Sequence, residues 1–220
     1  MTEKKNVKKY FISGAIGFLL FAILTALVKT VDVKAVGPLG SKIGLSGINT
    51  YFRDLVGVNM NLYDMTELLG YLAIAVAAGF ALLGAWQLIK GKSIKAVDTD
   101  ILVLGGLLVA LAGAYVFFEI VIVNYRPIIM DGKLEASFPS SHTMLSVAIF
   151  GAAVHQLFMR IENKATRITL TVIAVFLMTA TVIGRILSGV HWLTDILAGV
   201  ILSASLLMFY IGFCRLCVKK

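Results

Sequence analysis

The chain has 220 residues, of which 59% are hydrophobic and 15% are charged, and its formal net charge is +8. This composition excludes an ordinary soluble globular domain, because such domains rarely contain repeated apolar runs of about 18 residues or more. The apolar runs use most of the length, so we expect residues 1–220 to form a single membrane-embedded domain.

Six apolar runs have the length and composition of membrane-spanning helices. In chain order they lie at roughly residues 10–28, 68–89, 101–123, 143–159, 168–183 and 196–213. A span needs about 20 mainly apolar residues, and the fourth and fifth runs are the shortest of the six. We therefore predict an all-α integral membrane protein, built as a bundle of six transmembrane helices.

The longest region outside these runs separates the first from the second. Its sequence GINTYFRDLVGVN places Ile48, Tyr51, Phe52 and Leu55 at the spacing of one helical face. Such an apolar face predicts a short amphipathic helix. This helix either lies in the membrane interface, beside a route of lipid entry, or packs as a cap on the bundle.

The positive charges are unevenly distributed between the loops. Thirteen of the twenty Lys and Arg residues lie in the four segments 1–9, 90–99, 160–167 and 214–220. Cytoplasmic segments of membrane proteins are enriched in Lys and Arg, so we predict that both termini are cytoplasmic. The positive charge therefore indicates membrane topology, and we expect no nucleic-acid partner.

Two polar loops then fall on the same, outer side of the membrane. They are NYRPIIMDGKLEASFPSSH (residues 124–142) and GRILSGVHW (residues 184–192). In the second loop, His191 is followed four residues later by Asp195. On a helix this spacing would place the carboxylate one turn from the imidazole, where it could orient a nucleophilic histidine. The alternative is a histidine at a helix entrance with a favourable acidic residue in the first turn.

The remaining polar residues of the two loops suit a phosphate group. Arg126 and Arg185 offer planar guanidinium donors, and Ser140 and Ser141 offer hydroxyl and backbone donors at a helix start. His142 could donate a proton to a leaving oxygen. The chain contains no H-E-x-x-H or P-loop pattern, so we expect neither a metal nor another cofactor.

Three segments together resemble the signature of the type 2 phosphatidic acid phosphatase family, which reads K-x6-R-P, P-S-G-H and S-R-x5-H-x3-D. The corresponding segments here are E-x6-R-P (119–127), P-S-S-H (139–142) and G-R-x5-H-x3-D (184–195). The resemblance implies six helices and a catalytic set of His191 as nucleophile, Asp195 as its orienting group and His142 as acid. It also implies that Arg126, Arg185, Ser140 and Ser141 bind the phosphate.

The segments depart from the family pattern at three positions. Ser141 replaces a glycine, Gly184 replaces a serine and Glu119 replaces a lysine. Three interpretations of Glu119 remain open. It could hold Arg126 or Lys133 by an ion pair, it could be protonated or help to select the substrate, or it could mark a site that binds lipid without turnover. Glu119 and Lys133 are therefore further candidates for substrate binding.

The predicted function is metal-independent hydrolysis of a terminal lipid phosphate through a phosphohistidine. The expected substrates are undecaprenyl diphosphate or phosphatidylglycerophosphate, and the expected location is a bacterial plasma membrane with the active site facing outside. The bilayer and its lipid phosphate are the expected partners, with no obligate protein partner. The alternatives are a phosphotransferase that uses the same phosphohistidine and a non-catalytic protein that binds or transports lipid.

Overall fold

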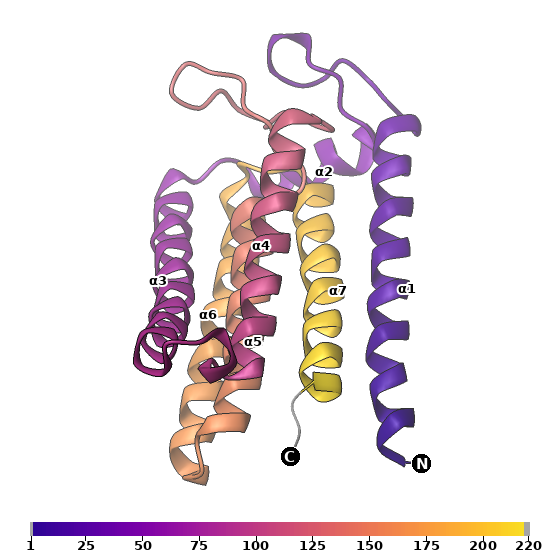
Figure 1. The fold of residues 1–220 in the computed structure, drawn as a ribbon. Helices are drawn as coiled ribbons and strands as arrows, with labels where there is room; N and C mark the ends of the chain where they lie inside the picture. The colour runs from indigo at the N-terminus through magenta and orange to yellow at the C-terminus, as the bar shows by residue number, and fades with distance from the viewer. Residues whose placement is uncertain (1, 218–220) are drawn as a thin grey trace.

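A computed structural model describes residues 2–217, with side chains from Val7 onward (Figure 1). These residues form α1 (Thr2–Thr30), α2 (Ser46–Val56), α3 (Met60–Gly91), α4 (Thr99–Ile120), α5 (Ser141–Arg160), α6 (Lys164–Ser188) and α7 (Leu193–Cys217), with short 3-10 helices η1 (Pro38–Gly40) and η2 (Ile94–Ala96). All the α-helices except α2 are long and apolar enough to cross a membrane. The predicted all-α bundle of six spans is therefore confirmed.

Several helices extend beyond the predicted spans, and two of the boundaries that differ bear on the site. Helix α3 begins at Met60 rather than near Leu68, because Asn59 caps its N-terminus by accepting a hydrogen bond from Leu62 N at 3.1 Å. Helix α4 ends at Ile120 rather than at Val123. The three residues after Ile120 are all β-branched, which weakens their helical preference where the chain leaves the bundle. Both differences matter for the site, which lies at these two helix ends.

Helix α7 packs against α1, α4 and α5 (Figure 1). Small residues let α1 approach it closely. A side chain at Gly14 would meet the ring of Phe209, and one at Gly17 would meet Ser205. Ser205 also donates a hydrogen bond from its hydroxyl to Gly14 O at 2.6 Å. Close backbone approach of this kind is the usual way in which membrane helices associate.

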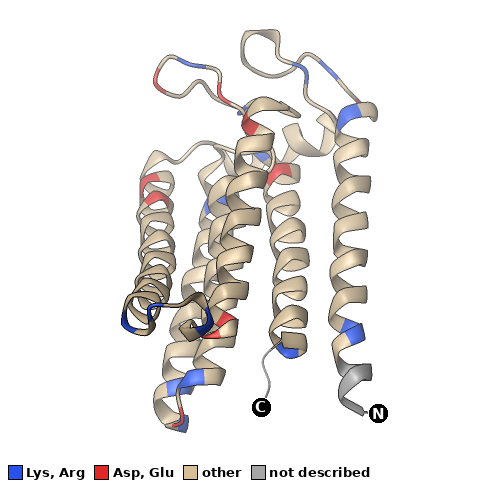
Figure 2. Cartoon of the chain, viewed as in Figure 1, with Lys and Arg blue, Asp and Glu red and all other residues tan. Residues whose placement is uncertain are grey.

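The two ends of the bundle differ in composition. Both ends of the chain lie at one end of the bundle, and the two long loops project from the other, as Figure 1 shows. Lys and Arg residues occur at both ends, whereas acidic residues occur mainly around the loop end, so the end with the chain termini has the larger excess of positive charge (Figure 2). The loop end also receives the C-terminal ends of α4 and α6 and the first turns of α5 and α7, and this brings both polar loops together.

A network of polar side chains joins three helices at the end with the chain termini. Arg160 at the end of α5 contacts Asp98 at 2.9 Å and forms a second ion pair with the buried Asp100 of α4. Its Nε donates to Gln156 Oε1 at 2.7 Å, and the Gln156 amide donates to the Tyr210 hydroxyl of α7 at 2.8 Å. These contacts fasten α4, α5 and α7 together far from the polar loops.

Helix α2 turns its apolar face away from the protein. Ile48, Tyr51 and Leu55 are exposed, whereas the polar Asn49 is completely buried. The Asn49 amide donates to Thr194 Oγ1 at 3.0 Å and its oxygen accepts from Thr194 N at 3.2 Å. A cap packed on the bundle would bury the apolar face instead. The structure therefore favours the interfacial alternative for this helix.

Three aromatic rings support the loop that leads into α5. The ring of Phe138 lies 6.0 Å from that of Phe21 in α1 and 5.9 Å from that of Phe118 in α4. Phe138 is almost fully buried, and it directly precedes the Pro-Ser-Ser-His segment. Aromatic contacts of this type add to the stabilisation gained by burying the rings. They fix the position from which α5 and His142 start.

Candidate active site

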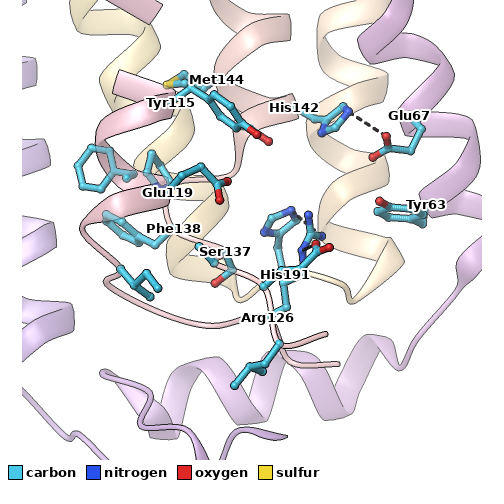
Figure 3. Close-up of a pocket in the computed structure, with 17 residues that line it drawn as sticks. Tyr63, Glu67, Tyr115, Glu119, Arg126, Ser137, Phe138, His142, Met144 and His191 are labelled. Carbon is cyan, nitrogen blue, oxygen red and sulfur yellow. Dashed lines mark hydrogen bonds and ion pairs between the residues drawn. The ribbon is translucent and has the colours of Figure 1, made fainter. Parts of the chain in front are cut away.

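A cavity of about 490 Å³ lies at the loop end of the bundle, between α3, α4, α5 and the 121–140 loop. Figure 3 shows Tyr63 and Glu67 entering it from α3, with Tyr115 and Glu119 facing them from α4. Arg126, His142 and His191 also line it, as do Glu135, Ser137 and Ser141. Titratable groups from three parts of the sequence thus share one space, which is the arrangement expected of an active site.

His191 and Asp195 are brought together by the turn that precedes α7. His191 lies before the helix and Asp195 in its first turn, so the pair does not lie on one helical face as the spacing suggested. The His191 Nδ1 lies 3.7 Å from Asp195 Oδ2. That carboxylate is held in place because it accepts from Trp192 N at 3.0 Å and from Asn124 Nδ2 at 3.2 Å.

The other nitrogen of His191 faces a guanidinium. Arg126 Nη1 lies 3.3 Å from His191 Nε2. Arginine has only donors, so Nε2 must be the acceptor and therefore carries a lone pair rather than a proton. Burial lowers the pKa of His191 well below its ordinary value, and the charges of Arg126 and Arg185 lower it further. The imidazole is thus neutral at physiological pH, as a nucleophile must be.

Arg185 is fully buried at the end of α6, and two residues of α3 hold it. The Glu67 carboxylate accepts a hydrogen bond from Nη2 in a close ion pair, and the Tyr63 ring lies 4.7 Å from the guanidinium carbon. Nε and Nη1 of Arg185 are buried without a hydrogen-bond partner in the described part of the chain. Like Ser140, Arg185 is not among the residues that line the cavity. Buried donors without a partner are costly, so an anion that reached this guanidinium would be stabilised by it.

His142 in the first turn of α5 contacts the same carboxylate. Its Nε2 lies 3.2 Å from Glu67 Oε2, as Figure 3 shows, and its Nδ1 is buried without a partner in the described residues. A side chain at Gly70 of α3 would lie only 2.3 Å from the His142 ring. The glycine therefore makes the room that the imidazole occupies.

The two serines differ in their access to the cavity. Ser141 lines it, whereas Ser140 is completely buried and does not. The Ser140 N–H, expected to be available to phosphate, donates instead to Asp195 O at 3.0 Å. That expectation is corrected: the backbone of Ser140 joins the start of α5 to the first turn of α7.

Lys133 lies at the exposed tip of a hairpin and does not line the cavity. The hairpin turns at Asp131 and Gly132, which both have positive φ, and Met130 N and Lys133 O are 3.0 Å apart across it. The proposed role of Lys133 in substrate binding therefore lacks support from its position. The neighbouring Glu135 reaches the site instead, with its carboxylate 3.1 Å from Arg126 Nε.

Glu119 lines the cavity one turn after Tyr115. Of the three interpretations of this residue, an ion pair with Arg126 or Lys133 is contradicted, because Arg126 contacts Glu135 and His191 instead. Glu119 has no ion pair with any residue that the structure describes. The carboxylate thus remains available to a ligand in the cavity (Figure 3).

Gly184, which stands in place of the family's serine, has a packing role. A side chain here would lie 2.5 Å from the methyl group of Thr66 in α3. The glycine therefore lets α3 approach α6 at the residue just before Glu67. This departure from the family pattern accompanies the contact between Glu67 and Arg185.

Four residues that contact the predicted site residues were not themselves predicted from the sequence, namely Tyr63, Glu67, Asn124 and Glu135. Glu67 could have been found, because an ionisable residue at the edge of an apolar span is a candidate for function. The predicted second span begins at residue 68, so Glu67 lies one residue outside it. Asn124, Tyr63 and Glu135 carry no pattern of their own, and only their contacts with Asp195, Arg185 and Arg126 reveal them.

The fold and the site together define a class of protein: a helical membrane protein with paired arginines and histidines for phosphate chemistry at one end of the bundle. The model of the PAP2 superfamily matches residues 119–215, so this part of the chain is similar to that superfamily. The match confirms the predicted family resemblance. It also confirms the predicted class of enzyme, a phosphatase that acts on lipid phosphates.

A solved structure has the same fold along nearly the whole chain. It is the first transmembrane PAP2 type phosphatidylglycerolphosphate phosphatase from Bacillus subtilis, with 17% sequence identity and a TM-score of 0.66. The similarity covers 94% of this chain and 98% of that one. No curated protein sequence matches the chain.

Proposed function

We propose that the protein hydrolyses the terminal phosphate of a membrane lipid through a phosphohistidine at His191. The observation that carries this proposal is the contact of Arg126 with His191 Nε2, an unprotonated nitrogen that lines the cavity beside a phosphate-binding group. In the first step the Nε2 lone pair forms a bond to phosphorus and the phosphorus–oxygen bond of the leaving group breaks. His142 gives its proton to the leaving oxygen.

In the second step water releases the phosphate. Neutral His142 takes a proton from the attacking water, the new oxygen–phosphorus bond forms and the bond to His191 breaks. Asp195 stabilises the positive imidazole ring of the phosphohistidine between the two steps. Arg126 and Arg185 bind the phosphate oxygens in both, since their guanidinium donors match its geometry.

The substrates that we propose are phosphatidylglycerophosphate and undecaprenyl diphosphate, and Glu119 favours the first. A diphosphate places a second anionic phosphoryl group directly beside the scissile one, where a carboxylate would repel it. The glycerol of phosphatidylglycerophosphate instead places a hydroxyl donor near the scissile phosphate. The activity named for the similar Bacillus subtilis structure supports the same choice.

Phosphate release by the purified protein in detergent with EDTA tests the activity. We expect release from at least one of phosphatidylglycerophosphate, undecaprenyl diphosphate, phosphatidate and undecaprenyl phosphate, and none from His191→Ala. Transfer of phosphate to an added acceptor lipid, with no release to water, would favour a phosphotransferase. Lipid binding without either reaction would overturn the proposal.

The proposed orientation places the cavity at the outer face of a bacterial plasma membrane. The excess of Lys and Arg around the opposite end supports it (Figure 2). A membrane-impermeant thiol reagent applied to intact cells provides the test. We expect it to label Lys133→Cys in the hairpin but not the native exposed Cys217 at the other end. Labelling of Cys217 alone would reverse the orientation.

A further inference from the structure

We infer that Glu67 of α3 is a positioning residue for the reaction, and that it forms with His142 a second histidine–carboxylate dyad. This inference rests on the proposed function. Helix α3 lies outside the part of the chain that matches the family model, which begins at residue 119. The dyad therefore joins a residue of the family signature to one that the signature does not include.

The two oxygens of the Glu67 carboxylate have different partners. Oε2 lies 3.2 Å from His142 Nε2, and Oε1 forms the close ion pair with Arg185. One carboxylate thus bridges the proposed proton donor and a proposed phosphate ligand. Only about a fifth of the Glu67 side chain is exposed, so water weakens these contacts less than it would weaken those of a surface pair.

Each contact leaves free the atoms that the reaction needs. Glu67 occupies Nε2 of His142, and the unpartnered Nδ1 remains as the atom that donates the proton. Glu67 occupies Nη2 of Arg185, and the unpartnered Nε and Nη1 remain for the phosphate oxygens.

The position of α3 is determined by packing rather than by this ion pair alone. Gly70 makes room for the His142 ring, and Gly184 makes room for Thr66. Along α3, Gly70 lies three residues after Glu67, and Thr66 lies one residue before it. The carboxylate is thus held between two helix contacts, which is what a positioning residue requires.

Other charged and titratable groups also face His142 from the elements around it. From the remaining walls of the site these are Tyr63, Tyr115, Glu119, Arg126 and His191. The buried Arg185 shares the Glu67 carboxylate with His142. Among the residues that the structure describes, the carboxylate that contacts the His142 ring is that of Glu67. Its replacement should therefore alter proton donation more than the replacement of another acid would.

A pair of substrates separates proton donation from phosphate binding. One is a long-chain alkyl phosphate, whose leaving oxygen needs a proton. The other is a nitrophenyl phosphate with the same chain, whose nitrophenolate leaves without one. We would measure kcat/KM for both with the full-length protein in detergent, because this ratio reports the steps up to phosphoryl transfer.

We expect Glu67→Gln to lower kcat/KM by about 100-fold or more for the alkyl phosphate, the range of a lost general acid. The loss for the nitrophenyl phosphate should be at least tenfold smaller, and it reports the disturbed Arg185. Glu67→Asp should recover part of the alkyl activity because it keeps the charge. Asp64→Asn, which removes an exposed carboxylate of the same helix, should change neither value by more than twofold.

Equal losses for the two substrates, or no loss for either, would overturn the inference. Equal losses would mean that Glu67 supports only the fold or the binding of phosphate by Arg185, and elution of each variant as a single species would separate these two cases. Absence of turnover in the unmodified protein would instead contradict the proposed function, so the two failures are distinguishable.

Discussion

Arg126 donates a hydrogen bond to the nitrogen of His191 that we propose as the nucleophile, over a distance of 3.3 Å. The guanidinium therefore acts on the histidine before any substrate is present. It lies against the lone pair and its charge disfavours protonation of the ring. When a phosphate enters, its oxygens can take over the guanidinium donors and leave Nε2 free to attack.

The first prediction concerns the pH dependence of this nucleophile. Because the pKa of His191 is depressed by burial and by Arg126, His191 should stay unprotonated well below the ordinary histidine pKa of about 6.5. The decrease of kcat/KM on the acid side of the pH profile should therefore occur below about pH 6.5. Arg126→Gln removes one cause of the depression, so we expect this decrease to move to higher pH, together with a lower rate from weakened phosphate binding.

A pH–rate profile of the two proteins with one lipid phosphate provides the measurement. An acid-side decrease that stays at the same pH in Arg126→Gln would show that Arg126 does not set the protonation of the nucleophile. Lys133→Gln, which removes a cation from the exposed hairpin tip, is the matched control and should leave the profile unchanged.

The second prediction concerns Gly184, where the family signature has serine. Gly184→Ser restores the family residue, yet we expect it to lower kcat/KM by tenfold or more, because its side chain would collide with the Thr66 methyl group and displace α3. Thr66→Ser removes that methyl group and retains the hydroxyl that donates to Tyr63 O. The double variant should therefore regain most of the activity, measured as phosphate release. Full activity in Gly184→Ser alone would refute the packing argument.

The third prediction concerns the substrate choice made by Glu119. Glu119→Ala should keep measurable turnover, whereas His191→Ala should have none. In Glu119→Lys we expect kcat/KM for undecaprenyl diphosphate to rise relative to phosphatidylglycerophosphate by tenfold or more, because a cation replaces an anion beside the second phosphoryl group. Rates for both lipids with each variant give this ratio. An unchanged ratio would remove Glu119 from substrate selection, and equal loss in the alanine variants would place it in the catalytic core.

The fourth prediction concerns stability at the opposite end of the bundle. Arg160→Met should lower the free energy of unfolding by about 2 kcal/mol, because it leaves the buried Asp100 without its cation. Hydrogen bonds from Arg160 and Gln87 lower the pKa of Asp98, so its contribution is present above the ordinary Asp pKa and is lost as the pH falls. Thermal unfolding in detergent at neutral and acidic pH tests both points. An unchanged melting temperature would mean that this network adds no net stability.

The sequence was sufficient for the spans and for the residues of the signature, because apolar length and motif spacing are local properties. His142 and His191 are far apart in the chain, but the alternation of the helices places their loops at one end of the bundle. The contacts of Glu67 could not be derived in the same way. They depend on how closely α3 approaches α5 and α6, and this approach is set by the glycines at positions 70 and 184. The hydrogen bond that occupies the Ser140 N–H likewise depends on where α7 begins.

Phe21 gives α1 a share in the site, although none of the described side chains of α1, from Val7 onward, lines the cavity. The Phe21 ring packs against the Phe138 ring, and the chain runs directly from Phe138 to His142. A version of the protein shortened by this helix would leave the Phe138 ring open to lipid on that side. A foreign membrane anchor that replaces α1 must therefore carry an aromatic side chain at the same depth. An apolar segment of the right length would restore membrane insertion but not the position of the loop that contains Phe138.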